Sequence, residues 1–254
     1  SKIINYLVFF LILFVFTISF IQMNSQHWSA RFDTDFFNIY NILLVKSDYP
    51  QLFVDHPAFT LYFINSIILR IYGLINSNLL FSIDYIENVE NLDLYFEKIF
   101  YVARTINAII HCFCIYFLYL ILNKLRTEKW LNFLILLFFI SSNFFLLNLF
   151  QIRPEIYSIF FFLIFFLLVL NSFDNDKKII LIFLAGFLSG LAYISKIQII
   201  FFIFFIFFIF PFLSALVNKQ NLKYENNFLL NKKKLFNFSL ILYFFIFITY
   251  ILIE

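Results

Sequence analysis

The chain has 254 residues, of which 63% are hydrophobic and 13% are charged. A soluble domain carries about 25% charged residues, so this composition excludes a water-soluble globular protein and predicts that lipid is the solvent for much of the chain. The net charge of +3 says little by itself, but the placement of the charges along the chain is informative. We expect membrane lipids, and no nucleic acid, among the partners.

Seven apolar stretches predict transmembrane helices, because each is near the roughly 17–25 residues that cross a bilayer, the fourth being a little short. In lipid they must be helical, since every backbone amide needs a partner within its own segment. The stretches are Ile3–Met23, Ile99–Leu122, Trp130–Phe150, Ile156–Leu170, Ile179–Ser195, Ile197–Val217 and Phe236–Ile253. The expected fold class is an all-α, polytopic bundle of transmembrane helices. Because the chain stops within the last stretch, we expect it to be part of a longer protein.

An eighth apolar stretch, Pro57–Ile75, is interrupted by Asn65 and Arg70, so it either spans the membrane or lies in its interface. Charge favours the interface, because the N-terminus and the later basic loops then share the cytoplasmic side, as the positive-inside rule requires. The basic loop 218–235 is cytoplasmic in this arrangement, and the large loop 24–98, with nine acidic and four basic residues, lies outside. This predicts a multi-pass protein with juxtamembrane helices in its outer loop. We expect it in a bacterial plasma membrane, with its active site facing outward.

Two further features concern the apolar stretches themselves. The run 179–217 has 39 residues, and one continuous helix of that length would measure about 58 Å, so a turn is required. Lys196 is the only charge in the run that can mark the turn.

Cys112 and Cys114 are two residues apart, which places them on roughly opposite sides of a helix. This spacing predicts buried small side chains rather than a disulfide or a shared metal site.

Asp33 and Asp35 lie about ten residues after the first predicted span. Two carboxylates just outside the membrane suit a general base or a metal site. The simpler interpretation is that Asp35 is an exposed N-cap, because a helical pattern of apolar residues begins at Phe36.

Polar residues also open the Pro57–Ile75 stretch, where His56 follows Asp55. A proline in the first turn of a helix is ordinary. The pair therefore suits either a ligand-binding site or a polar start of a helix.

Charges of both signs occupy the short predicted outer turn Arg153-Pro154-Glu155. Charges at this depth are unfavourable, so they suit a binding site, although an Arg–Glu pair that holds two helix ends is an equal alternative. Lys196, at the outer end of the fifth span, either extends to the interface or faces inward to bind a phosphate.

A polar stripe runs along the second predicted span and contains Arg104, Asn107 and His111. Spacings of three and four place these residues on one face of a helix. Intramembrane polar groups of this kind suit a function, but hydrogen bonds between helices are the commoner explanation.

The order of these features resembles a known family, the GT-C glycosyltransferases of the dolichyl-phosphate-mannose protein mannosyltransferase and aminoarabinose transferase kind. The motifs that carry the resemblance are Asp33-Thr34-Asp35, Asp55-His56-Pro57, Ala103-Arg104 with Ala108, Arg153-Pro154-Glu155, and Leu184-Ala185-Gly186 continuing through Gly190 to Lys196. Many members have Asp-Glu at the first motif, whereas this chain has Asp-Thr-Asp.

The resemblance implies transfer of a sugar from a polyprenyl-phosphate donor to a lipid, glycan or protein acceptor on the outer face. It implies that Asp33 or Asp35 is the catalytic base and that Glu155 is a second acidic residue of the site. Arg153 and Lys196 are then candidate phosphate ligands, His56 lies near the acceptor or sugar, and Arg104 joins the substrate-binding set. A divalent cation is a cofactor of some members only.

Two other classes remain open from the sequence. A transporter or lipid-linked glycan flippase predicts repeats, breaks inside spans and charges at the membrane midplane. A polysaccharide polymerase also uses outer loops. The polar residues of this chain gather at the outer edge, which favours the transferase.

Overall fold

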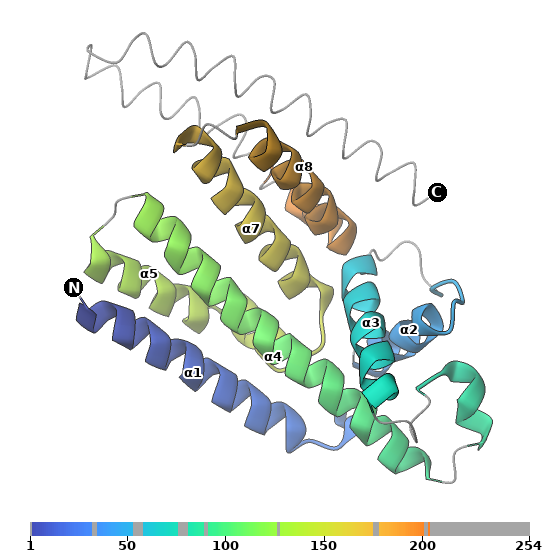
Figure 1. Cartoon of the computed structure of the whole chain (residues 1–254). Helices are drawn as coiled ribbons and strands as arrows, with labels where there is room; N and C mark the ends of the chain where they lie inside the picture. Colours follow the sequence, from blue (N-terminus) through green and yellow to red (C-terminus); the bar gives the residue numbers. More distant parts are fainter. Residues whose placement is uncertain are drawn as a thin grey trace, which may run out of the picture.

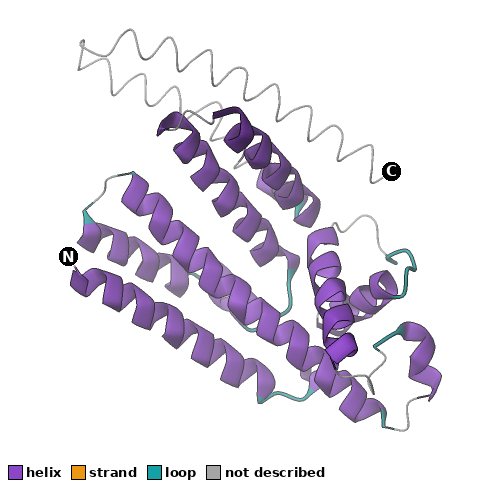
Figure 2. Cartoon of the chain, in the orientation of Figure 1, coloured by secondary structure: helices purple, strands orange, loops and turns teal. Residues whose placement is uncertain are grey.

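The computed structural model describes residues 2–31, 35–52, 58–75, 81–88, 91–125, 128–174, 178–200 and 203. These residues form α-helices and short 3-10 helices, with no strand among them (Figure 2). The α-helices are α1 Lys2–Asn24, α2 Phe37–Lys46, α3 Phe59–Ile75, α4 Leu92–Lys124, α5 Lys129–Ser141, α6 Asn143–Leu149, α7 Pro154–Asp174 and α8 Lys178–Ser195. The 3-10 helices are η1 Trp28–Arg31, η3 Ile83–Asn88 and η4 Ile197–Ile199. The predicted all-α class is confirmed.

The long helices are those of a multi-pass membrane protein. In the described part of the chain, α1, α4 and α7 are long and apolar enough to cross a membrane, and α5 with α6 makes a fourth candidate if the bent pair is one span. The helix α8 is apolar but shorter. Two predicted segments lie outside the described residues, the loop 218–235 and the stretch Phe236–Ile253. Of the predicted stretch Ile197–Val217, only residues 197–200 and 203 are described.

The predicted third span is two helices rather than one, because α5 and α6 meet at an angle of 61°. Ser142, between them, has an extended backbone, and its hydroxyl accepts a hydrogen bond from the Phe145 N–H at 3.2 Å. Serine side chains compete with helical hydrogen bonds and favour such caps. The Ser141-Ser142 doublet therefore ends one helix and begins the next.

The long helices lie side by side, α1 beside α4, α4 beside α7 and α7 beside α8 (Figure 1). A large apolar core joins α1, α4, α5 and α7, and a second one joins α7 to α8. Small residues of α8, including Ala185 and Ala192, are fully buried against α7. The Ser158 hydroxyl also donates to the Ala192 carbonyl at 2.8 Å. Close packing through small residues is typical of helices in lipid.

The outer surface of α1 is strongly apolar. Its exposed side carries the large side chains of Ile3, Tyr6, Phe9, Phe10, Leu13, Phe14 and Ile21. A contiguous apolar surface of this kind is rare on soluble monomers, and it suits contact with lipid.

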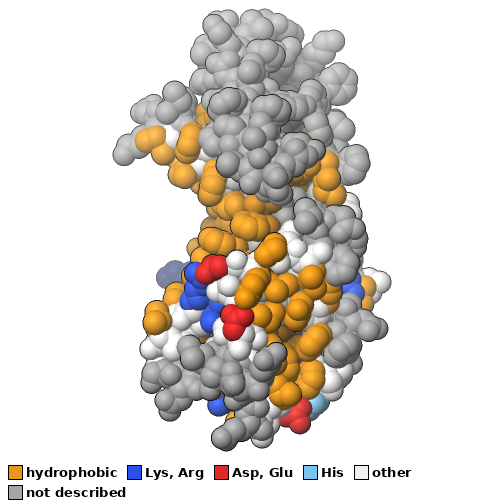
Figure 3. All heavy atoms as spheres, turned by 90° about the vertical axis from the view of Figure 1, so that its right-hand side faces the viewer, with side chains coloured by type: hydrophobic (Ala, Val, Ile, Leu, Met, Phe, Trp, Pro, Cys, Tyr) orange, Lys and Arg blue, Asp and Glu red, His pale blue; other side chains and the backbone are white. Residues whose placement is uncertain are grey.

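The helix α3 contacts the ends of α7 and α8 and does not run alongside them (Figure 1). The Thr60 hydroxyl contacts the hydroxyl of Ser195, the last residue of α8, and Asn65 Nδ2 donates to the Tyr157 hydroxyl at 2.8 Å. The exposed side of α3 is mostly apolar and carries Phe59, Phe63, Ile67, Ile71 and Leu74, with Arg70 as an exposed charge. Figure 3 views the molecule from the side on which α3 lies, and apolar side chains there surround a few charged ones. The interfacial position expected for Pro57–Ile75 stays a prediction.

Candidate functional site

A polar cluster occupies one end of the bundle, around the turn that connects α6 to α7. Ile152, in the middle of this turn, is held through both of its backbone polar groups. Its N–H donates to Asp35 Oδ1 at 2.9 Å, and its carbonyl accepts from Asn38 Nδ2 at 2.7 Å. Asp35 and Asn38 are one helical turn apart, so they present a donor and an acceptor to the same residue. The start of α2 therefore clamps the turn.

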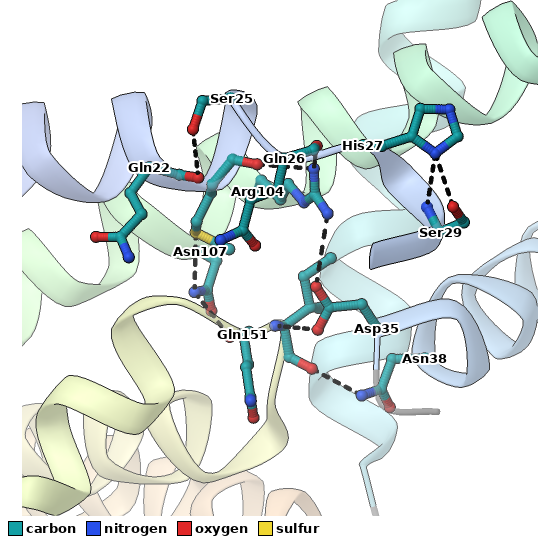
Figure 4. A network of polar contacts seen from close by, with 12 residues as sticks. Gln22, Ser25, Gln26, His27, Ser29, Asp35, Asn38, Arg104, Asn107 and Gln151 are labelled. Atoms are coloured by element: carbon teal, nitrogen blue, oxygen red, sulfur yellow. Dashed lines mark hydrogen bonds and ion pairs between the residues drawn. The ribbon is translucent and has the colours of Figure 1, made fainter. Parts of the chain in front are cut away.

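Arg104 of α4 connects this clamp to α1. Its guanidinium donates to the carbonyls of Met23 and Gln26 at 2.7 and 2.8 Å, and it lies 3.9 Å from the Asp35 carboxylate (Figure 4). The Arg104 and Asp35 side chains are only 4% and 1% exposed. The guanidinium also lies 5.0 Å from the centre of the Phe100 ring. A planar fork of donors suits several fixed acceptors of this kind.

The position of Asp35 differs from the simpler sequence interpretation. Asp35 is fully buried. The helix α2 begins at Phe37, so its N-cap position is Phe36, which has a helical backbone and makes no side-chain cap. The interpretation of Asp35 as an exposed N-cap is therefore wrong. Its carboxylate is turned to a residue 117 positions later in the chain, which no local pattern indicates.

The stripe on α4 faces the inside of the bundle, as predicted. Asn107 Nδ2 donates to the carbonyls of Asn148 and Gln151 at 3.2 and 3.1 Å. His111 is buried, its Nδ1 donates to the Asn107 carbonyl at 2.8 Å, and its ring packs edge-on to Phe145. Asn148 lies in the last turn of α6 and Gln151 two residues beyond the helix, where backbone carbonyls lack α-helical partners. Hydrogen bonding between helices explains Asn107.

A second ion pair lies at the first turn of α7. Glu155 Oε1 is 2.9 Å from Lys196 Nζ, and the two side chains are 23% and 30% exposed. Lys196 has an extended backbone directly after α8, so the helix breaks at the position predicted for the turn. The alternative in which Arg153 pairs with Glu155 is wrong, because Lys196 is the partner. Within the described residues, Arg153 Nε is buried without a hydrogen-bond partner.

An apolar pocket of about 490 Å³ opens beside this pair. Its walls come from α5, α6, α7 and η4, and Glu155 and Lys196 are its charged residues. The other lining residues are Phe139, Phe144, Ser158, Ile159, Phe162, Leu163, Gln198 and Ile199. Phe139 and Phe144 lie on either side of the break at Ser142, so the bend between α5 and α6 forms part of the wall. Phenylalanine is so frequent in this chain, with 44 residues, that its positions alone do not indicate the wall of a pocket.

The structure thus brings together four of the predicted site residues in two pairs, Asp35 with Arg104 and Glu155 with Lys196, while Arg153 lies in the turn between them. Asp33 and His56 lie outside the described residues. In the part of the chain that is described, no three His, Cys, Asp or Glu side chains form a group that can hold a metal ion. No known protein family, curated protein or solved structure matches this chain.

Proposed function

We propose that this protein is a membrane glycosyltransferase that moves a sugar from a polyprenyl-phosphate donor to a lipid, glycan or protein acceptor at the outer face. The observation that carries the proposal is the Glu155–Lys196 pair at the edge of an apolar pocket. A polyprenyl phosphate has an anionic head and a long apolar chain. A cation beside an apolar wall complements both parts of such a molecule.

The leaving group sets the requirement for positive charge. When the bond between the sugar carbon and the phosphate oxygen breaks, the phosphate departs with the electron pair, and nearby cations stabilise its charge. Lys196 and Arg153 are the cations of this part of the site. Positive charge at the membrane edge also retains the lipid phosphate after transfer.

The acceptor hydroxyl must lose its proton as it attacks the sugar carbon, so a carboxylate base is required within hydrogen-bond reach. Asp35 accepts the Ile152 N–H and faces Arg104 in a fully buried position, which suits holding the turn in place. We therefore assign the base to Asp33, two residues earlier in the chain. His56 is proposed to lie near the acceptor or the sugar, and a divalent cation is not required by these roles.

A transporter or flippase is the second candidate, and the bend between α5 and α6 favours it. Broken helices are typical of transporters, where the break lines the substrate site. In this chain, however, the charged pairs lie at one end of the bundle, beside the turn that precedes α7. A transport function predicts substrate movement without any transfer of sugar.

The test is a transfer assay with the purified full-length protein in liposomes that contain polyprenyl-phosphate sugars. We expect Asp33→Asn to lower the rate by about 10²–10⁴-fold, because a general base contributes a factor of this size. Asp35→Asn should lower the rate less and also lower thermal stability. Glu97→Gln, at an exposed acidic residue of the same loop 24–98, is the matched control and should leave both unchanged.

Two results contradict parts of this assignment. Unchanged rates in both Asp33→Asn and Asp35→Asn remove the catalytic base. No transfer from any carrier, combined with movement of a labelled lipid-linked sugar between leaflets, favours the flippase.

A further inference from the structure

We propose that Glu155 is a displaceable counter-ion, which occupies Lys196 while the pocket is empty and gives way to the phosphate of an incoming long-chain phosphate ester. This inference rests on the proposed function and extends it, because it gives Glu155 a role in loading the donor. It makes the ion pair part of an exchange between two anions that compete for one cation.

The geometry of the pair supports an exchange. Only one Glu155 oxygen contacts Lys196, at 2.9 Å, and the other, Oε2, is buried without a hydrogen-bond partner within the described residues. Both side chains line the same pocket. An anionic head that reaches Lys196 from the pocket therefore meets the Glu155 carboxylate at close range. Two anions at this distance repel each other, so a phosphate on Lys196 weakens the contact with Glu155.

The strength of the pair also suits exchange. Both side chains are partly exposed, and exposed ion pairs are weak. The lysine ammonium is a compact charge on a flexible stem, and it can turn its donors from one acceptor to another.

The chemistry of the occupant follows from charge and polarity. Most of the lining residues are apolar, Ser158 and Gln198 are polar, and Glu155 and Lys196 are the charged ones. A head that bears negative charge replaces Glu155 on the lysine, and a hydrocarbon chain fills the wall. Inorganic phosphate lacks the chain, and a prenyl alcohol lacks the charge. A bilayer phospholipid has both features, so the experiment must separate it from a prenyl phosphate.

The experiment measures binding of farnesyl phosphate by calorimetry to the full chain in zwitterionic nanodiscs, without any sugar. We expect Glu155→Gln to bind about two- to five-fold more tightly than wild type, because the competing ion pair is absent. Lys196→Gln should bind at least about ten-fold more weakly, since a charge-assisted contact is lost. Farnesol should bind all variants equally, and inorganic phosphate should bind far more weakly than farnesyl phosphate. Nanodiscs with an anionic phospholipid reveal whether bilayer lipid competes.

The matched control is Asp48→Asn, which removes the carboxylate of another ion pair, Arg70–Asp48, whose atoms are 2.7 Å apart and exposed. Asp48 has a positive φ of 62°, which asparagine also adopts readily. This variant should bind like wild type. Equal or weaker binding by Glu155→Gln, with Lys196 still required, overturns the exchange. Because no sugar is present, this outcome is independent of whether the protein transfers one.

Discussion

The two ion pairs beside the α6–α7 turn, Asp35–Arg104 and Glu155–Lys196, differ in how their carboxylates are held. Asp35 is fully buried and accepts the Ile152 N–H, while Arg104 donates to two backbone carbonyls. The closest approach of the Asp35 and Arg104 side chains is 3.9 Å. Both side chains thus bind backbone groups of other segments, which ties α1 and the start of α2 to the turn.

The Glu155–Lys196 pair has the opposite character. Its charged atoms are closer, at 2.9 Å, but the side chains are partly exposed and border an apolar pocket. Neither atom of this contact is fixed by a backbone partner among the described hydrogen bonds. A short ion pair can therefore be the weaker one, because burial and the number of fixed partners decide how much is lost when it breaks. The Asp35–Arg104 pair therefore suits a role in stabilising the fold, and the Glu155–Lys196 pair suits the exchange of one anion for another.

The largest expected difference between the pairs is in stability. Arg104→Gln leaves the Met23 and Gln26 carbonyls and the Asp35 carboxylate without their cation, which costs about 3–5 kcal/mol when the group is buried. Lys196→Gln should cost less than about 1 kcal/mol, because the pair is partly exposed. The measurement is the free energy of unfolding in mixed micelles of a mild detergent and dodecyl sulfate. Arg70→Gln, at an exposed ion pair, is the control. Equal losses at Arg104 and Lys196 would remove the distinction between the pairs.

A smaller effect is expected at the clamp that connects the two pairs. Asn38→Ala removes the donor to the Ile152 carbonyl and the acceptor of the Tyr62 hydroxyl. We expect a loss of about 1–3 kcal/mol, because buried polar groups are left without partners. Transfer should fall as well, since the turn carries Arg153 and Glu155. Thr17→Ala, which removes an exposed bond within α1, should change neither. Normal transfer with lowered stability would show that the clamp does not position the site.

Much of the fold follows from local sequence patterns. The bounds of α1 and α8 differ from the predicted ones by at most one residue, because apolar length and flanking polar residues define such helices. The break at Lys196 was predicted from the excessive length of the apolar run. The inward face of Arg104, Asn107 and His111 followed from helical periodicity, which places residues three and four apart on one side.

The partners within the site could not be predicted in the same way. Glu155 and Lys196 belong to different helices, and Asp35 binds a turn 117 residues later in the chain. Contacts of this kind depend on how helices pack, which spacing does not encode. The bend at Ser142 has a local signal in two consecutive serines, but that signal is weak within a run of phenylalanine and leucine. The pocket wall depends on the bend, so it was missed too.

The weakest effect is expected at a third carboxylate contact, fully at the surface, where the Tyr49 hydroxyl donates to Asp84 Oδ1 at 2.9 Å. This hydrogen bond, and then the negative charge of Asp84, raise the pKa of Tyr49 above its ordinary value of 10.0. The stabilisation is therefore complete below pH 10 and is lost as the pH rises through the pKa of the folded state. Difference spectra between wild type and Tyr49→Phe give the phenolate titration of Tyr49 alone. Asp84→Asn should lower that pKa toward the ordinary value, whereas Asp93→Asn should not. If Asp84→Asn leaves the pKa of Tyr49 unchanged, the hydrogen bond between Tyr49 and Asp84 is absent in solution. The short distance of this surface contact would then contribute nothing to stability, in contrast to the buried Asp35–Arg104 pair.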